Sequence, residues 1–196
     1  MDMKKVPTQA LVCDESFNIG DIKIDLETNR CNNKPCSALW TSTWRRDPFR
    51  IGWINWNIGT YLNLGHSLLK SQLLRLFPKR NGVKVYEVNN EKDLRGIPII
   101  GKDSDYYDWL QRFSYNYDCV YFDYKELERR GYSGLHVTDR AISIGKDWFK
   151  GFKEGFDPYR MGISGFDCES TVWFNSDWIE GFSIIEDDLI TALNRR

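Results

Sequence analysis

The chain has 196 residues, of which 41% are hydrophobic and 28% are charged, and its 27 basic and 28 acidic residues leave a net charge of -1. These values are ordinary for a globular protein, and they exclude a strong overall positive field that would attract a nucleic-acid backbone. No apolar run reaches the roughly 18 residues of a transmembrane helix, and the N-terminal residues lack the apolar segment of a signal peptide. We therefore expect a cytoplasmic protein with no membrane partner.

Aromatic residues make up 15% of the chain, with 8 Trp, 10 Tyr and 11 Phe, and some of them could form flat walls for a ring-bearing ligand. The five cysteines are an odd number, which favours reduced thiols over a disulfide framework. There are only two histidines, and the paired spacings of structural zinc sites are absent, so we expect no metal site.

Residues 1–36 are polar and irregular, and we interpret them as an N-terminal extension of a core over residues 38–185, with residues 1–196 forming a single domain. Period-two alternation predicts a strand over residues 21–26, and composition predicts a loop over residues 28–37. A β-favouring run at residues 38–43 predicts the next strand, which ends in small hydroxyl side chains.

Leucines at spacings of three and four predict a helix over residues 62–77, which Pro78 would end. Clean alternation predicts a half-buried strand over residues 83–88. A short helix is expected from residue 91, and another over residues 105–113.

The chain then continues with a short strand at residues 119–122 and a helix through residue 130 that Asp123 caps and Gly131 closes. Further strands are predicted at residues 133–137 and 171–174, on either side of a glycine-containing loop over residues 140–165. A segment at residues 178–185 precedes a C-terminal helix from about residue 186. Several short strands separated by irregular helices indicate an α+β fold.

Glu169 stands at the entrance of the apolar run Val172-Trp173-Phe174 and is the first candidate for a functional residue. It could be a charged residue at a strand edge that caps a turn or pairs with an arginine. It could instead be a carboxylate at the rim of a cleft, where it would stabilise developing positive charge or orient a hydroxyl. Alternation along an extended strand places Glu169 on the same face as Thr171 and Trp173.

The hydroxyl cluster Thr41-Ser42-Thr43 is the second candidate. It could simply solvate a strand edge, or its small residues could let a ligand bond to the backbone. No histidine is close in sequence to activate these hydroxyls, so a Ser-His-Asp triad is not expected. His136 lies between Leu135 and Val137, faces away from both, and is interpreted as a structural histidine.

Phosphate-binding glycine motifs are absent, which argues against a P-loop kinase or a dinucleotide-binding dehydrogenase. The order of the remaining motifs is informative. A strand ending LWTST precedes a strand VKVYEV. Later, YFDYKELERRGYSGLHV runs helix, Gly-Tyr-x-Gly and strand, and a final strand ESTVWFN is followed by Ser-Asp-Trp-Ile. Over about residues 38–180, this order resembles the ADP-ribosyltransferase superfamily, in its small bacterial and viral members.

This resemblance implies a split pair of small mixed or antiparallel β-sheets around a cleft, with peripheral helices. It also implies an enzyme that transfers ADP-ribose from NAD+, as a substrate, to a macromolecular acceptor. Glu169 matches the catalytic glutamate of the family, which holds the nicotinamide-ribose hydroxyl and stabilises an oxocarbenium-like state.

The resemblance also implies contacts with NAD+. Ser42 falls where the backbone grips the nicotinamide carboxamide, and Thr43 where a ribose-side hydroxyl lies. Arg46, next to Arg45, could meet the diphosphate. The candidates for the aromatic that stacks on nicotinamide, each of which could equally be a core residue, are Trp53, Trp56 and Tyr61.

Thr41 departs from the family, because histidine or arginine is typical at its position. The sequence therefore leaves a second interpretation open, a catalytically inactive module of the same fold that binds a nucleotide, a nucleic acid or a protein partner. A third is an unrelated α+β domain in which Glu169 is a surface residue. The acceptor could be protein or nucleic acid, and residues 140–165, where aromatic and basic residues alternate, are the expected contact region.

Overall fold

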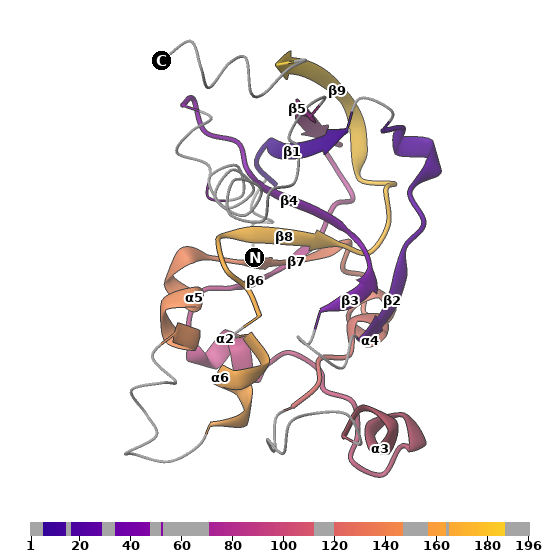
Figure 1. Ribbon diagram of the computed structural model, residues 1–196, viewed down its shortest axis with the longest axis vertical. Helices are drawn as coiled ribbons and strands as arrows, with labels where there is room; N and C mark the ends of the chain where they lie inside the picture. Colours follow the sequence, from indigo (N-terminus) through magenta and orange to yellow (C-terminus); the bar gives the residue numbers. More distant parts are fainter. Residues whose placement is uncertain are drawn as a thin grey trace.

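The computed structural model describes residues 6–14, 17–28, 34–47, 52, 71–111, 120–146, 157–163 and 165–186. Figure 1 shows a sheet that crosses the middle of the molecule, with the helices gathered mainly at one end. Within the described residues, the strands are β1 (Gln9–Asp14), β2 (Asp25–Thr28), β3 (Pro35–Ser37), β4 (Leu39–Thr43), β5 (Ser71–Pro78), β6 (Val85–Val88), β7 (Gly134–Val137), β8 (Ser170–Trp173) and β9 (Ile179–Glu186). The helices are η1 (Ile19–Asp21), α2 (Glu91–Arg95), α3 (Asp105–Gln111), α4 (Tyr124–Arg129), α5 (Asp139–Lys146) and α6 (Pro158–Ile163).

Seven of these strands form one mixed sheet in the order β6-β7-β8-β4-β1-β5-β9, and β2 pairs with β3 separately. The β6–β7 pair is parallel, whereas the other neighbours in the large sheet are antiparallel. The large mixed sheet with a few short helices confirms the predicted α+β class. Among the described residues, no helix is long and apolar enough to cross a membrane.

Strand β4 joins the two halves of the large sheet through different residues. Leu39, Trp40 and Thr41 pair with β8, whereas Ser42 and Thr43 pair with β1 on the other side. The β4–β8 ladder therefore stops at Thr41, and beyond it Thr43 contacts Glu169, the next residue in the register, through the Glu169 side chain. We call the region around Thr43 and Glu169 the seam.

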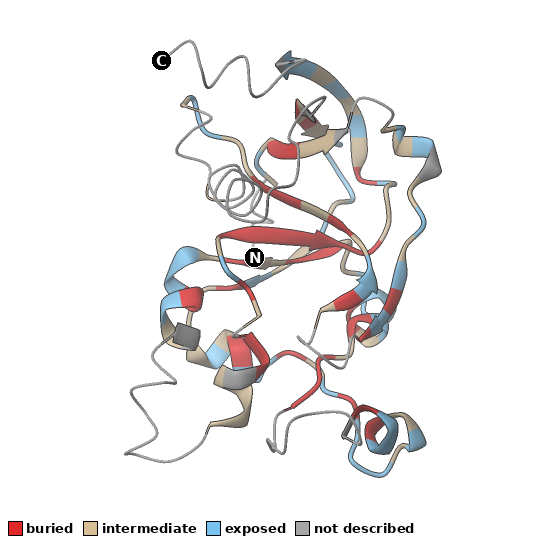
Figure 2. Cartoon of the chain, in the orientation of Figure 1, coloured by how far each residue is buried: buried red, intermediate tan, exposed pale blue. Residues whose placement is uncertain are grey.

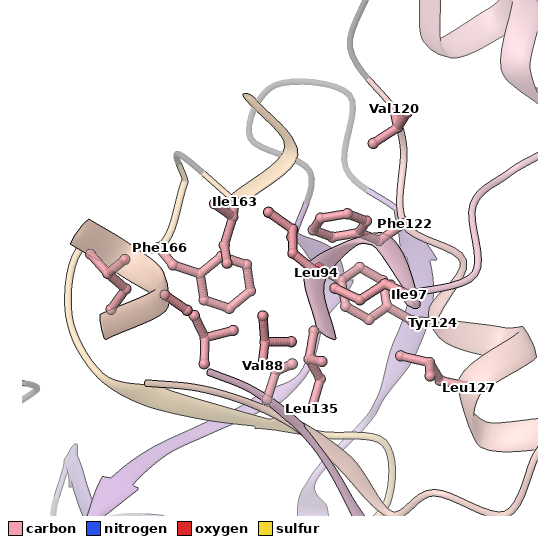
Figure 3. Close-up of a cluster of buried hydrophobic side chains, with 14 of the residues drawn as sticks. Val88, Leu94, Ile97, Val120, Phe122, Tyr124, Leu127, Leu135, Ile163 and Phe166 are labelled. Atoms are coloured by element: carbon pink, nitrogen blue, oxygen red, sulfur yellow. The ribbon is translucent and has the colours of Figure 1, made fainter. Parts of the chain in front are cut away.

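The two faces of the sheet carry separate cores, because side chains alternate along each strand. Val172 in β8 and Leu135 in β7 point to one face, where they pack with residues of α2, α4, α5 and α6. Figure 3 shows this cluster, in which Leu94, Phe122, Tyr124 and Ile163 converge over the sheet.

Trp173 and Leu39 point to the opposite face and pack with Leu74 and Leu76 of β5. The rings of Trp173 and Trp178 stack with their centroids 3.7 Å apart. Strand β8 is buried on both faces along its whole length, as Figure 2 shows. This double burial explains why the strand reads as an apolar run after its polar entrance.

The structure corrects the prediction of a helix over residues 62–77. Residues 71–78 form strand β5, between β1 and β9, and Pro78 is the last residue of that strand. Leu73, Leu74 and Leu76 are all almost fully buried. Leu74 and Leu76 lie on one face of this strand and Leu73 on the other, so closely spaced leucines can be buried by a strand as well as by a helix. The rest of the predicted helix, residues 62–70, lies outside the described residues.

The structure also corrects the prediction of an N-terminal extension, because β1 falls within residues 1–36. This strand pairs with β4 on one side and with β5 on the other. Its apolar stretch Ala-Leu-Val-Cys is short and flanked by polar residues, which hid it in the sequence. The strand predicted at residues 21–26 begins later, as β2, and follows the 3-10 helix η1.

The predicted loop over residues 140–165 is wrong at both ends. Residues 139–146 form α5, and residues 158–163 form α6. Ala141 and Ile142 in α5, and Ile163 in α6, are buried against the sheet, so packing overrides the glycine signal there. The C-terminal helix expected from residue 186 lies outside the described residues, except that Glu186 itself ends strand β9.

Other elements are confirmed with small shifts of their ends, among them β4, β6, β7, β8, α2, α3 and α4. The Asp123 side chain accepts a hydrogen bond from the Glu126 N–H at 2.9 Å, as the predicted cap of α4 requires. Gly131 follows α4 with φ of 81°, a left-handed conformation that favours glycine. The strand predicted at residues 119–122 is reduced to an isolated bridge between Ile99 and Phe122.

Candidate functional site

Glu169 lies in the seam, and the residue is only 5% exposed. Its Oε1 atom accepts hydrogen bonds from the Thr43 hydroxyl at 2.8 Å and from the Thr43 N–H at 3.2 Å. Its Oε2 atom is buried and has no hydrogen-bond partner among the described residues. The carboxylate is thus held through Oε1 alone, and Oε2 remains able to accept a hydrogen bond. Because a buried oxygen without a partner costs free energy, a hydrogen-bond donor to Oε2 would be favourable.

The backbone around Glu169 is held by three different segments. The Ser42 hydroxyl donates to the Glu169 carbonyl at 2.7 Å, and the Glu169 N–H donates to Asp139 Oδ1 at 3.3 Å. Gly52 lies against Cys168, so that a Cβ at residue 52 would stand 3.2 Å from the Cys168 Cβ. These contacts fix the entrance of β8 and therefore the direction of the Glu169 side chain.

His136 comes from β7, the neighbour of β8 on its other side. Its Nδ1 atom lies 2.8 Å from the Thr171 hydroxyl, and its Nε2 atom lies 3.5 Å from Glu169 Oε1. Burial lowers the pKa of the imidazole, while the Glu169 carboxylate acts in the opposite direction. The neutral imidazole is therefore favoured beside the carboxylate at neutral pH.

The hydroxyl of Thr41, which is fully buried, links two other side chains. It donates to Gln9 Oε1 at 2.7 Å and accepts from Trp173 Nε1 at 2.7 Å. The Gln9 amide group in turn donates to the Pro7 carbonyl. The Thr41 hydroxyl thus satisfies a buried indole and a buried amide, which accounts for its burial without a ligand.

The sequence-predicted residues are brought together only in part. Thr43 contacts the Glu169 carboxylate, and Ser42 contacts the Glu169 backbone. The alternative in which Thr41, Ser42 and Thr43 solvate an edge is wrong, because Thr41 and Ser42 are buried in the sheet interior. Arg46 is exposed and follows β4. The remaining candidates lie outside the described residues and stay predictions: Trp53, Trp56 and Tyr61.

The alternative in which Glu169 is an exposed residue paired with an arginine is also wrong, given its burial and its partners. The predicted placement of Glu169, Thr171 and Trp173 on one face is confirmed, since Glu169 and Thr171 both reach His136 and Trp173 reaches Thr41.

Sequence reasoning missed the proximity of His136 to Glu169, and it missed Gln9 and Asp139. Alternation did place His136 on the face opposite to Leu135 and Val137. The order of the strands was the missing information, because β7 pairs with β8 in the register His136 opposite Thr171. Gln9 carried no signal, because β1 was not recognised as a strand.

An open pocket of about 590 Å³ lies elsewhere, against β2, α3 and α4. Its charged lining residues largely satisfy one another: Lys125 pairs with Glu27, and Arg129 pairs with Glu126. The hydroxyl of Tyr106 donates to the Thr28 carbonyl. None of its lining residues belongs to the predicted site.

The seam can do specific chemistry. A carboxylate with one fixed oxygen and one available oxygen can accept a hydrogen bond from a hydroxyl and stabilise adjacent positive charge. Its low exposure strengthens such an interaction, because little water screens it.

No family model matches the chain, and no curated protein or solved structure with significant similarity to it was found.

Proposed function

We propose that the protein is an ADP-ribosyltransferase that transfers ADP-ribose from NAD+ to a macromolecular acceptor, with Glu169 as its catalytic carboxylate. The observation that carries the proposal is the state of this side chain, with Oε1 held by Thr43 and Oε2 buried without a partner among the described residues. The β4–β8 ladder ends at Thr41, where β4 continues with β1, so the single seven-stranded sheet has two parts that β4 joins, and this supports the split pair of sheets that the family resemblance implies.

The residues present fit what the reaction requires of a carboxylate. In the transfer, the bond between the ribose C1 and the nicotinamide nitrogen breaks, its electron pair leaves with nicotinamide, and an acceptor atom that loses a proton bonds to C1. Positive charge develops on the ribose during this step. Glu169 Oε2 would accept a ribose hydroxyl hydrogen bond, and its negative charge would stabilise the ribose.

Thr43 has a positioning role in this proposal. Its two hydrogen bonds prevent the carboxylate from rotating, so that the Oε2 atom points in one direction before a substrate arrives. The proposed contacts of Ser42 and Arg46 with NAD+, and of one of the three aromatic candidates with nicotinamide, complete the site.

A second candidate function is a binding module of the same fold without turnover. Thr41 favours it, because this residue replaces the histidine or arginine of the family and its hydroxyl already serves Gln9 and Trp173. Such a module would bind a nucleotide, a nucleic acid or a protein partner. Quenching of tryptophan fluorescence by NAD+ without any turnover would favour it over the enzyme.

The experiment that tests the enzyme is labelling of a cell extract with biotinylated NAD+ and purified protein. Wild type should label a discrete acceptor, whereas Glu169→Gln should not, because the substitution keeps the shape and removes the charge. Glu128→Gln is the matched control, since Glu128 is an exposed carboxylate on α4. Equal labelling by wild type and Glu169→Gln would contradict the assignment of Glu169.

A further inference from the structure

His136 is the ionisable side chain that approaches the Glu169 carboxylate from β7. The Nε2–Oε1 separation of 3.5 Å is longer than an ordinary hydrogen bond, so the contact is electrostatic. The imidazole is 16% exposed and the carboxylate side chain 6%, so solvent screens the pair only weakly. The charge state of His136 must therefore change the electrostatic field around the Glu169 carboxylate.

The surroundings of His136 also select a tautomer. A carboxylate oxygen only accepts hydrogen bonds, so the nitrogen that faces it, Nε2, is favoured to carry the hydrogen. Nδ1 then accepts from the Thr171 hydroxyl at 2.8 Å. Neutral His136 with hydrogen on Nε2 is thus compatible with both neighbours.

Two further charged groups lie near His136, on elements that pack against β7. Glu87 of β6 lies opposite His136 in the parallel register, and Asp139 begins α5. Arg45 approaches Asp139 at 3.7 Å. Both Glu87 and Asp139 raise the pKa of His136, but less than Glu169 does, and burial outweighs all three. Glu169 is therefore the strongest charged partner.

We propose that His136 is a positioning residue that makes the Glu169 site sensitive to pH. When neutral, it leaves the carboxylate its full negative charge, and Oε2 remains available to a ligand hydroxyl. When protonated, it forms an ion pair with Glu169 at the same position and cancels the field that would stabilise positive charge on a ribose. The site is thus active with neutral His136 and is switched off as the imidazole gains a proton. This inference rests on the proposed function for its catalytic consequence, but not for the coupling itself.

The coupling is tested by nuclear magnetic resonance of the histidine side chains in the full chain, without any ligand. The chain has two histidines, so the signals that vanish in His136→Gln identify residue 136. Wild type should show the Nε2–H tautomer at pH 7.5. Glu169→Gln should lower the pKa of His136 further, because the main opposing charge is removed. Glu87→Gln should lower it less. The Nδ1–H tautomer, or an unchanged pKa in Glu169→Gln, would overturn the proposal.

The catalytic consequence is tested by the pH dependence of nicotinamide release from NAD+. Wild type should lose activity on the acid side, approaching about tenfold per pH unit below the pKa of His136. His136→Gln keeps an N–H donor without a titrating charge, so the part of the acid loss that follows the pKa of His136 should disappear, while its rate at pH 7.5 stays within about threefold of wild type.

His136→Leu also removes the titrating charge, so the acid loss that follows the pKa of His136 should disappear in it as well, whatever the change in packing does to its rate at pH 7.5. An acid loss with the same midpoint in His136→Gln as in wild type would overturn the proposal. If wild type releases no nicotinamide at any pH, the proposed function fails, and the histidine titration alone then decides the coupling between His136 and Glu169.

Discussion

Thr41 lies next to the candidate site, but its hydroxyl has a structural role. Its neighbours Ser42 and Thr43 contact Glu169, whereas Thr41 connects Gln9 of β1 to Trp173 of β8. Thr41→Val keeps the volume but leaves two buried polar groups without this partner. We expect it to lower the free energy of unfolding by about 2–4 kcal/mol, measured by urea denaturation.

Thr41→Ser is the matched control, because it keeps the hydroxyl and should lose less. A Thr41→Val protein as stable as wild type would show that the hydrogen-bonded chain from Gln9 to Trp173 contributes nothing.

A substitution at Thr43 can test the proposed site with little effect on the fold. Thr43→Val removes the 2.8 Å hydrogen bond to Glu169 Oε1 but keeps the backbone N–H. Because a hydrogen bond to a charged group is lost, nicotinamide release should fall by roughly tenfold or more. Thr43→Ser, measured alongside, should retain most of the rate. Equal rates for Thr43→Val and wild type would remove Thr43 from the site.

Those features of the site that lie within a single strand were predictable from the sequence. Alternation predicted that Glu169, Thr171 and Trp173 share a face, and the hydroxyl cluster ended the right strand. The contacts with His136 and Gln9 depend on which strands are neighbours. The ends of β7 and β1 lie 33 and 156 residues before the start of β8 along the chain, so no local pattern contains that information.

At the scale of elements, β5 shows where a local pattern fails. Spacings of three and four between leucines fit a helical face, and they also fit a strand that buries both faces. The position of β5 between β1 and β9 decides between them. By contrast, α4 was predicted almost to the residue, because its cap Asp123 and its closing Gly131 act within a few residues of the chain.

The pairing of β7 with β8 gives a prediction at the same scale. A Cβ at Gly134 would lie 2.8 Å from the Val172 carbonyl oxygen and 3.0 Å from the Trp173 ring. Gly134→Ala must therefore push the two strands apart, and we expect it to lower the free energy of unfolding by about 1–3 kcal/mol in chemical denaturation.

Gly181 in β9 is the control for this substitution, because a Cβ there would meet no atom within 4 Å. Gly181→Ala should change the stability by no more than about 0.5 kcal/mol. If both alanine variants are equally stable, the close approach of β7 to β8 is wrong.

At the scale of the whole molecule, His136 makes stability depend on pH. The folded state lowers the pKa of this imidazole through burial, so the unfolded chain binds the proton more readily than the native protein does. Stability therefore rises with pH in this range, and it is lost as the pH falls below the ordinary histidine value of about 6.5. The melting temperature should fall between about pH 7.5 and 5.5.

His136→Gln should flatten this dependence, because it removes the group that titrates there. A melting temperature that falls equally in wild type and in the variant would assign the pH dependence to other groups.

The two faces of the sheet differ in what they carry, and the residues of the proposed chemistry lie on only one of them. One face packs under α2, α4, α5 and α6, whereas the other carries the second core and the seam with Glu169, Thr43 and His136. The seam arises where β4 exchanges β8 for β1 as its partner. At this point the Glu169 carboxylate is held through Oε1, and Oε2 is the atom that a ligand hydroxyl would meet in the proposed function.

The most direct measurement of the central claim is nicotinamide release from NAD+ by the purified protein at pH 7.5, with and without cell extract as a source of acceptor. Wild type should release nicotinamide, and Glu169→Gln should be slower by about 100-fold or more, because the charge that stabilises the ribose is lost. Glu128→Gln should behave as wild type. Release at the wild-type rate by Glu169→Gln, or none by wild type even with extract, would contradict the account.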